Sequence, residues 1–430
     1  MLTRFSPRFT TPAELERHQL QGLRWTVNHA WENSPFYRER LGSAGVTPAD
    51  ITSLADLARL PFTDAADLRS EYPFPLRAAP FADLVRIHSS TGTTGKRKIL
   101  CYTQKDLDDW ADMFCRCYEL AGVTREDRVQ ICVGYGLWTA GIGFQAGCER
   151  YGALAVPVGP GNLELQTTFL LDLQATVLCC TASMGLLLAE EVHRRGLRDR
   201  LALRKVILGA ERSSDAMLAA IRRFLGVEEV YDIPGLTELY GPGIGLSCRE
   251  NAGIHYWADY YILELLDPQT LAPVKPGEIG EMVYTTLAKE GAPLIRYRSR
   301  DLTRLIPGEC PCGCGLPRHD RILGRSDDVV IFRGVNIHPG QIDELLSRID
   351  GVGSEFQLIL DHGADGRDYL AVRLERDRGV EADADERLSR AVAAAIKHTL
   401  MVSCVVEMLP YGELPRSERK TQRVFDRRSF

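Results

Sequence analysis

The chain has 430 residues, too many for one ordinary hydrophobic core and enough for a large domain with a smaller one. Apolar residues make up 45% and charged residues 26%, as in a globular protein. The net charge of −6 gives no electrostatic reason to expect nucleic acid or an anionic membrane as partner. We find no apolar core of a signal peptide and no bilayer-spanning run, so we expect a cytoplasmic protein.

Twelve cysteines in a chain of this size do not indicate a disulfide framework. Most lie singly in apolar runs, where we expect small buried hydrophobic side chains. These are Cys101, Cys132, Cys179, Cys180 and Cys404. The group at 310–314 has a different pattern and is a candidate metal site.

Residues 1–80 have a helical, polar pattern interrupted by Pro and Gly. From about 129, short apolar runs rich in β-branched residues alternate with amphipathic segments such as 183–196. These runs cover 129–135, 153–159, 176–181, 205–211 and 227–233. The alternation predicts an α/β fold with a parallel sheet and crossover helices. Folds of this kind bind ligands at the carboxyl ends of the strands.

The C-terminal half changes character twice. Residues 254–306 are β-rich, with alternating runs at 260–266 and 281–287. The pattern after about 327 is β-α-β-β-α-β, which is typical of a small α+β domain. We therefore predict a large domain over 1–326 and a small one over 327–430.

A run of small and hydroxyl residues that ends in lysine follows the apolar segment 84–88. It comprises Ser89, Ser90, Thr91, Gly92, Thr93, Thr94, Gly95 and Lys96. Such a run lets backbone N–H groups converge on one anion, and polyphosphate is the natural guest, although a flexible turn has the same composition. The glycine spacing and Arg97 after the lysine disfavour a P-loop kinase or GTPase.

Residues 88–103 resemble the phosphate loop of the adenylate-forming superfamily, and more closely that of the phenylacetate-CoA ligases. The resemblance extends over nearly the whole chain. It implies binding of ATP and a small C-terminal domain that is mobile. Arg97 stands where the family usually has proline.

The segment 232–238 follows a predicted strand and ends in a hydroxyl residue beside a carboxylate. This pair suits Mg²⁺ held against phosphate. An ordinary strand-loop-helix with a threonine cap would show the same sequence pattern. The resemblance makes Glu238 the magnesium ligand and Thr237 a phosphate contact. Asp232, Ile233 and Pro234 would then border the nucleotide, with Pro234 replacing an aromatic residue of the family.

Two further segments resemble nucleotide-binding parts of the family. Gly209, Ala210 and Glu211 would line the adenine and acyl sites. Asp301 would accept the ribose hydroxyls, although a surface ion pair among its arginine neighbours would explain it equally.

The hinge and the tail carry the remaining matches. Arg325 would contact ribose or phosphate, and Asp327 would be the hinge of the small domain. Lys420 corresponds to the lysine that bridges the acid carboxylate and the α-phosphate, where it stabilises developing charge. Without the resemblance, the tail would be a solvated basic run.

Cys310 and Cys312 form a compact thiolate group, and Cys248 and His255 lie upstream. Soft sulfur and nitrogen ligands in a set of four select zinc, so we predict a structural Zn²⁺ on these four residues. Cys314 is an alternative ligand, and ordinary reduced thiols are the simpler explanation.

The stretch 133–141 resembles the part of the family that borders the aryl group. It makes Tyr135 and Trp138 candidates for the acid pocket, together with Gly209, Ala210, Pro234 and Gly235. A planar acid between an aromatic ring and backbone is physically sensible, and aromatic core packing is the alternative.

Together these features predict an ATP-dependent ligase that activates an aromatic acid as acyl-AMP and passes the acyl group to coenzyme A. The acceptor could instead be a carrier-protein phosphopantetheine. A non-catalytic relative that binds nucleotide or acyl-AMP is the alternative of another class. Homodimer formation is left open by the sequence.

Overall fold

The computed structural model describes residues 9–70, 72–90, 97–211, 213, 215–327, 330–332, 335–337, 339–362, 368–415 and 423–428. These residues form two compact units. The first comprises the residues up to 180, 201–210 and 228–322, and the second comprises 181–200, 211–227 and the residues from 323 on. Within the described ranges, no helix has both the length and the apolar character that a membrane span requires.

The first unit begins with two helices, α1 (Pro12–Asn33) and α2 (Pro35–Ser43), as the sequence predicts. Thr11 caps α1 by accepting the N–H of Glu14, and proline at the first helical position has its φ already set. Short helical segments follow at η1 (Pro48–Asp50), η2 (Leu54–Arg59), α3 (Asp67–Ser70) and η3 (Phe81–Asp83). The buried face of α1 packs against a strand of the β-rich region.

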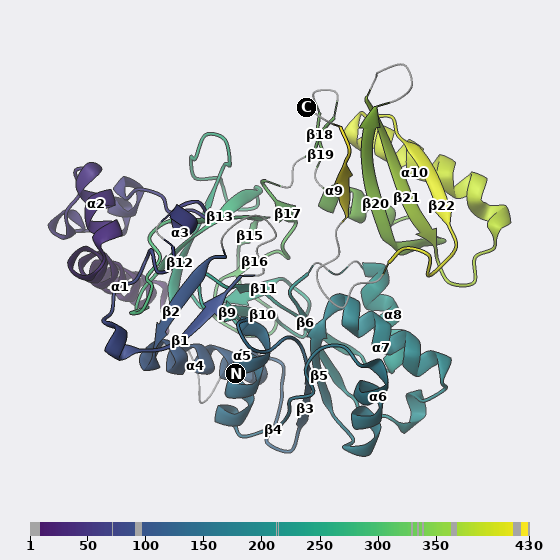
Figure 1. Cartoon of the computed structure of the whole chain (residues 1–430), viewed down its shortest axis with the longest axis horizontal. Helices are drawn as coiled ribbons and strands as arrows, with labels where there is room; N and C mark the ends of the chain where they lie inside the picture. The colour runs from purple at the N-terminus through teal and green to yellow at the C-terminus, as the bar shows by residue number, and fades with distance from the viewer. Residues whose placement is uncertain are drawn as a thin grey trace. The chain divides into compact units, whose positions relative to one another are not determined.

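The predicted parallel sheet is confirmed, and its strand order is β4-β3-β5-β6-β7. Its strands β4, β3, β5 and β6 are labelled in Figure 1. Its strands are β3 (Arg128–Cys132), β4 (Leu154–Val156), β5 (Val177–Thr181), β6 (Lys205–Gly209) and β7 (Glu229–Ile233). The registers between β3 and β4, β3 and β5, and β6 and β7 are all parallel. The central strands β5 and β6 are almost fully buried and therefore largely apolar, which explains why the sequence identified them.

Three helices of this unit are α4 (Gln104–Leu120), α5 (Thr139–Tyr151) and α6 (Leu163–Asp172). α5 packs against both α4 and β3. Gly147 lets the two helices approach closely, because a Cβ added there would lie 2.2 Å from the Cβ of Phe114. Close packing here fixes the segment that precedes α5.

A hairpin of β1 (Leu84–Ser89) and β2 (Ile99–Thr103) carries the predicted phosphate loop (Figure 1). Ser90 N–H donates to the carbonyl oxygen of Lys98 over 3.2 Å, which closes the base of the loop. Residues 91–96 lie outside the described residues, so the calls on Thr91, Gly92, Thr93, Thr94, Gly95 and Lys96 remain predictions.

The predicted β-rich region is also confirmed. Its short strands are β8 (Gly235–Leu236), β9 (Gly241–Pro242), β10 (Gly245–Ser247), β11 (Ile254–Tyr256), β15 (Leu305–Ile306) and β16 (Arg318–His319). Its longer strands are β12 (Tyr261–Leu266), β13 (Gly280–Thr286) and β14 (Tyr297–Thr303). β10, β11, β16 and β15 form one antiparallel sheet, and β12, β13 and β14 are consecutive neighbours in another.

The second unit contains two helices from the middle of the chain, α7 (Ala182–Arg194) and α8 (Asp215–Leu225), which pack together. Its later elements are β17 (Gly324–Arg325), β18 (Val330–Phe332), β19 (Val335–Ile337), α9 (Pro339–Leu346), β20 (Val352–His362), β21 (Asp368–Arg376), α10 (Asp385–Leu400), β22 (Val405–Leu409) and β23 (Val424–Asp426). The short segments η4 (Arg198–Arg200) and η5 (Ala382–Ala384) complete it.

The small domain differs from the predicted pattern at its two ends. Its first strand, β18, pairs with β19 in a two-stranded sheet, and Phe332 lies opposite Val335. The four-stranded sheet has the order β22-β21-β20-β23, so the tail supplies an edge strand that the sequence pattern missed. β23 is only three residues long and its burial is incomplete, which explains its weak apolar signal.

The cysteine prediction is confirmed with one correction. Every cysteine is a free thiol, and Cys101, Cys132, Cys179 and Cys180 are buried. Cys404 is only half-buried, because it lies just before β22, an edge strand whose residues are partly exposed.

A buried ion pair ties α4 to the β-rich region. Both Nη atoms of Arg116 donate to the two carboxylate oxygens of Asp259 over 2.7 Å, and both side chains are almost fully buried. The guanidinium also lies 4.9 Å from the ring centre of Tyr260 and 5.7 Å from that of Trp257. Such a pair is costly to break, since a single remaining charge would be uncompensated.

We therefore expect Asp259→Ala to lower the free energy of unfolding of this unit by about 3 kcal/mol or more. The measurement is urea unfolding followed by tryptophan fluorescence. Arg59→Ala is the control, because Arg59 is exposed in the same unit and its pairs with Asp50 and Asp56 should contribute little. Equal small effects of both changes would contradict this assignment.

Candidate active site

The carboxylate of Glu238 is the buried charge around which the predicted magnesium motif is arranged. Glu238 lies between β8 and β9, and its side chain is 2% exposed. The ammonium of Lys98 makes an ion pair with Oε1, and Tyr297 Oη donates to the same oxygen over 3.0 Å. Burial would raise the pKa of the Glu238 carboxyl, but the charge and hydrogen bond of Lys98 and the bond from Tyr297 lower it overall.

Lys289 fixes the backbone of the same loop. Its Nζ donates to the carbonyl oxygens of Glu238, over 2.9 Å, and Leu239, over 2.5 Å. It also lies 4.7 Å from the ring centre of Tyr102. Lys289 is completely buried, and burial lowers the pKa of its ammonium to about 8 against the opposing charge of Asp106.

The hydroxyl of Tyr102, on β2, joins this loop to the phosphate-loop hairpin. It is within 3.1 Å of the carbonyl oxygens of Thr237 and Tyr240. Thr237 is half-buried and immediately precedes Glu238 in the sequence. The hairpin that carries the phosphate loop and the loop that carries the predicted metal ligand are thus connected by side-chain and backbone bonds.

His88, the last residue but one of β1, stays neutral in this environment. It is 1% exposed, and its ring meets Tyr102 and Trp110 edge-on at 5.3 and 5.6 Å. Its Nδ1 lies 3.3 Å from the carbonyl oxygen of Leu137. Burial lowers the pKa of this imidazole to about 4.

The residues predicted to line the adenine and acyl sites lie close together at the carboxyl ends of β6 and β7. Gly209 is opposite Ile233 in the register, and a Cβ on it would lie 2.9 Å from the Ile233 carbonyl oxygen. Ala210 has φ of 70° and is exposed. Pro234 is buried, and a Cβ on Gly235 would lie 2.7 Å from Cα of Pro242.

Two of the predicted nucleotide residues have structural partners. The carboxylate of Glu211 accepts the backbone N–H of Ser183 over 2.6 Å, in the first turn of α7, where a negative charge is favourable. Asp232 donates its N–H to Ser247 Oγ over 2.8 Å. Burial raises the pKa of its carboxyl to about 6, and Arg321 opposes this rise.

The two aromatic candidates for the acid pocket flank the loop before α5. Tyr135 packs over Gly141, where an added Cβ would lie 2.5 Å from its ring. Its hydroxyl is buried and has no hydrogen-bond partner among the described residues. Trp138 packs against Gly134, and its ring centre lies 5.2 Å from the guanidinium carbon of Arg97.

Asp301 lies on β14 and is half-buried, with its N–H donating to Ser299 Oγ over 3.0 Å. The neighbouring arginines have other partners. Ion pairs join Arg296 to Glu264, Arg298 to Glu281, and Arg300 to Glu281 and Asp64.

In the second unit, the half-buried Arg325 pairs with the exposed Asp327. Arg325 Nε and Nη2 donate to the two carboxylate oxygens of Asp327 over 2.9 and 3.0 Å. Lys420 lies outside the described residues, so its role remains a prediction.

The four predicted zinc ligands lie together in the first unit. One ligand atom from each of Cys248, His255, Cys310 and Cys312 lies within 4.8 Å of the others. His255 Nδ1 is 2.9 Å from the carbonyl oxygen of Leu316, and its Nε2 is 3.3 Å from Cys312 Sγ. The contact of Nδ1 with the Leu316 carbonyl oxygen orients the ring so that Nε2 points toward the thiols, as in histidines that ligate metals.

The fourth cysteine near this group, Cys314, contributes its backbone amide. Cys314 donates its backbone N–H to Cys312 Sγ over 3.4 Å, and it is not part of the four-ligand group. Gly313, with φ of 78°, makes the turn that brings this amide to the sulfur. Burial raises the pKa of the Cys312 thiol to about 12, and this bond from the Cys314 amide opposes the rise.

The sequence analysis missed three side chains that contact Glu238 or its loop. Lys98, Tyr297 and Lys289 approach it from segments far away in the chain. Only Lys289 could have been noticed in the sequence, because it is a single lysine beside an apolar run. A buried lysine needs compensating partners, so its position indicates a specific structural contact.

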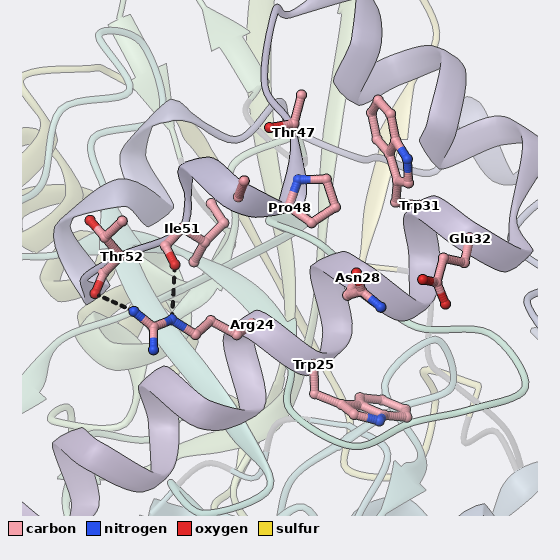
Figure 2. Close-up of a pocket in the computed structure, with 10 residues that line it drawn as sticks. Arg24, Trp25, Asn28, Trp31, Glu32, Thr47, Pro48, Ile51 and Thr52 are labelled. Carbon is pink, nitrogen blue, oxygen red and sulfur yellow. Dashed lines mark hydrogen bonds between the residues drawn. The ribbon is translucent and has the colours of Figure 1, made fainter.

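A surface pocket lies elsewhere, between α1 and the segment 47–52 (Figure 2). The guanidinium of Arg24 donates to the carbonyl oxygens of Ile51 and Thr52 over 2.9 Å. Trp25, Asn28 and Trp31 border it from α1. None of its lining residues belongs to the motifs above, so this pocket is not the candidate active site.

Comparison with known proteins defines the class of protein first. Residues 42–287 match the family of AMP-binding enzymes, and residues 334–428 match the C-terminal domain of AMP-binding enzymes. Among solved structures, a 2-hydroxyisobutyryl-CoA ligase in its postadenylation state has a TM-score of 0.89 at 27% identity, covering 99% of this chain and 92% of that one. The fold is therefore that of the adenylate-forming ligases.

Curated relatives are more similar. The phenylacetate-coenzyme A ligase of Escherichia coli is 40% identical over 97% of this chain and 96% of its own length. The corresponding ligase of Thermus thermophilus is 38% identical over 97% of this chain and 98% of its own length. The chain belongs to the phenylacetate-coenzyme A ligases within the AMP-binding enzyme family.

These findings confirm the predicted family, fold class and enzyme class, an AMP-forming acid–thiol ligase. They also support the predicted function, an ATP-dependent ligase that joins an aryl acid to coenzyme A.

The buried neutral His88 gives a pH-dependent prediction. Its folded pKa, about 4, lies below the unfolded value of about 6.5, so protonation of the unfolded chain lowers stability as pH falls between these values. When the pH falls from 7 to 5, we expect the free energy of unfolding of His88→Phe to decrease by about 2 kcal/mol less than that of the unchanged protein.

The measurement is urea unfolding at the two pH values. His398→Gln is the control, because that side chain is exposed on α10 and should show the unmodified pH dependence. An identical pH dependence of His88→Phe and the unchanged protein would contradict a buried neutral imidazole.

Proposed function

We propose that this enzyme uses ATP to activate a small aromatic carboxylic acid and transfers the acyl group to coenzyme A. The observation that carries the proposal is the buried, ionised carboxylate of Glu238, held beside the base of the phosphate loop by Lys98 and Tyr297. Four curated relatives at about 40% identity are named phenylacetate-coenzyme A ligases.

The chemistry of Glu238 and Thr237 fits Mg²⁺, because a carboxylate and a hydroxyl are hard oxygen donors. We assign Glu238 as its ligand and Thr237 as a contact of the nucleotide phosphates. The ion would neutralise charge on the polyphosphate. The N–H groups of the loop 89–96 would hold the same phosphates.

The remaining nucleotide residues are assigned by family likeness. We propose that Asp301 and Arg325 bind the ribose or phosphate, that Gly209 and Ala210 border the adenine, and that Asp327 is the hinge of the small domain. The pairing of Arg325 with Asp327 is compatible with this role, since Asp327 is exposed and Arg325 is only half-buried.

Two steps complete the reaction. An oxygen of the acid carboxylate attacks the α-phosphorus of ATP, pyrophosphate leaves, and acyl-AMP forms. Lys420 would lie between the two anions and stabilise the charge that develops. The sulfur of coenzyme A then attacks the acyl carbon, AMP leaves, and the thiol proton is lost.

The acid is proposed to be phenylacetate-like or aminobenzoate-like. Tyr135 and Trp138 would border its ring, with Gly209, Ala210, Pro234 and Gly235 along its other side. Close contacts leave no room for a side chain at Gly209 or Gly235, which suits a flat pocket wall. Coenzyme A is the proposed acceptor because the relatives are named for it, and a carrier-protein phosphopantetheine is the alternative.

The four-residue Cys/His cluster is proposed to hold a structural Zn²⁺. Three thiols and one imidazole nitrogen are a complete tetrahedral set, which suits structural zinc, whereas a catalytic site keeps a position open. The ion would tie the segment after β10 to the loop 310–312. We also propose a cytoplasmic location, consistent with the free thiols throughout.

ATP–pyrophosphate exchange with a panel of acids tests the proposed reaction. We expect exchange with phenylacetate, aminobenzoate or hydroxybenzoate, and less with 2-hydroxyisobutyrate. Glu238→Gln should lower the exchange rate about 100-fold or more, since it removes charge from the predicted magnesium ligand.

Glu149→Gln is the matched control, because it removes a carboxylate charge from the exposed side of α5 and should leave exchange intact. If no acid supports exchange, the non-catalytic alternative stands. Thioester formed only with holo-carrier protein would identify the alternative acceptor.

Metal analysis tests the zinc site. We expect about one zinc ion per chain, lost in Cys310→Ser because one of four ligands is removed. Cys180→Ser, a buried thiol on β5, should keep its zinc, as should Cys314→Ser, which retains the backbone N–H bonded to Cys312. An unchanged zinc content in Cys310→Ser would refute the assignment.

A further inference from the structure

Lys98 connects the phosphate loop directly to the predicted magnesium ligand. Its backbone carbonyl accepts the N–H of Ser90 and so closes the base of the loop. Its ammonium reaches the carboxylate of Glu238, 140 residues away in the sequence. The side chains are 17% and 2% exposed, so this is a largely buried ion pair between two functional segments.

The nearby cations have different partners. The guanidinium of Arg97 lies 5.2 Å from the ring centre of Trp138, and Lys289 donates to backbone carbonyls rather than to a carboxylate. Among the residues that the structure describes, Lys98 is therefore the cation that neutralises the carboxylate of Glu238. Without it, a nearly water-free carboxylate would lack a counter-charge, which is strongly unfavourable.

A divalent cation on Glu238 would need the negative charge that Lys98 now neutralises. An ammonium in contact with a ligand carboxylate lowers its affinity for a second cation, because like charges repel more strongly where water is scarce. The long, flexible stem of lysine allows the ammonium to move to another anion without backbone change. The loop 89–96, two residues before Lys98, is where the polyphosphate is expected.

We infer that Lys98 is a resident counter-cation of Glu238 and that it is exchanged for Mg²⁺ when the nucleotide binds. The inference rests on the proposed function, because it takes Glu238 as the metal ligand. The ammonium of Lys98 leaves the carboxylate and pairs with the nucleotide phosphates. The metal is thereby excluded from Glu238 in the absence of ATP and enters together with it. Lys98 is a positioning residue for this exchange.

Binding of Mn²⁺ to the full chain without nucleotide, followed by electron paramagnetic resonance, tests the inference directly. Glu238→Gln defines the background from other sites. We expect Lys98→Met to bind Mn²⁺ at the Glu238-dependent site roughly tenfold more tightly than the unchanged protein, because the competing charge is gone. Lys98→Arg should retain the weak binding.

Binding of ATP without divalent cation is the second readout. Lys98→Met should weaken it several-fold, because one phosphate partner is lost, while Lys105→Met should change neither measurement. Lys98→Met/Glu238→Gln serves as the folding control, since it removes both charges and leaves no unpaired ion. Its thermal stability should be close to that of the unchanged protein.

Two outcomes would overturn the inference. If Glu238→Gln abolishes Mn²⁺ binding but Lys98→Met does not tighten it, the metal site stands and the exchange does not. If Glu238→Gln leaves Mn²⁺ binding unchanged, Glu238 is not the ligand and both the inference and the metal assignment fail. Neither outcome depends on finding the acid, so both are separable from failure of the exchange panel.

Discussion

A carboxylate that is almost withdrawn from water must be kept ionised, and this constraint organises the centre of the molecule. Glu238 achieves it through an ammonium and a phenol hydroxyl, which outweigh the effect of burial on its pKa. These partners come from the phosphate-loop hairpin and from β14. The site is therefore assembled from three segments that only the fold brings together.

The same constraint explains the second lysine. Lys289 is completely buried, yet two backbone carbonyls and an aromatic face compensate its charge. By holding the carbonyls of Glu238 and Leu239, it fixes the direction of the loop that presents the carboxylate. Tyr102 adds bonds to the same loop from β2. Both residues hold the loop in place through its backbone.

Much of the architecture was predictable because its signals are local. The central strands β5 and β6 are buried and largely apolar, and the Cys/His group has the ligand types and the number of ligands that a tetrahedral site needs. The structure adds that His255 is oriented by Leu316 and that Cys314 supplies an amide rather than a thiol to the cluster. β19 and β23 were missed because each is three residues long and offers little periodicity.

The interactions at Glu238 were not predictable in the same way. The Lys98–Glu238 pair and the Tyr297–Glu238 bond span long separations in sequence, and no local pattern encodes such pairing. Arg97 was noticed as a departure from the family, and the structure shows its guanidinium over Trp138, a candidate for the acid pocket. Glu211 was assigned to the ligand site, yet it also bonds the first turn of α7.

The central claim is that the acid carboxylate attacks the α-phosphorus of ATP. The most direct measurement uses an aromatic acid whose carboxyl oxygens are ¹⁸O-labelled, with mass spectrometry of the products after thioester formation. The account predicts one labelled oxygen in AMP and none in pyrophosphate. Label in inorganic phosphate or pyrophosphate, with unlabelled AMP, would contradict it.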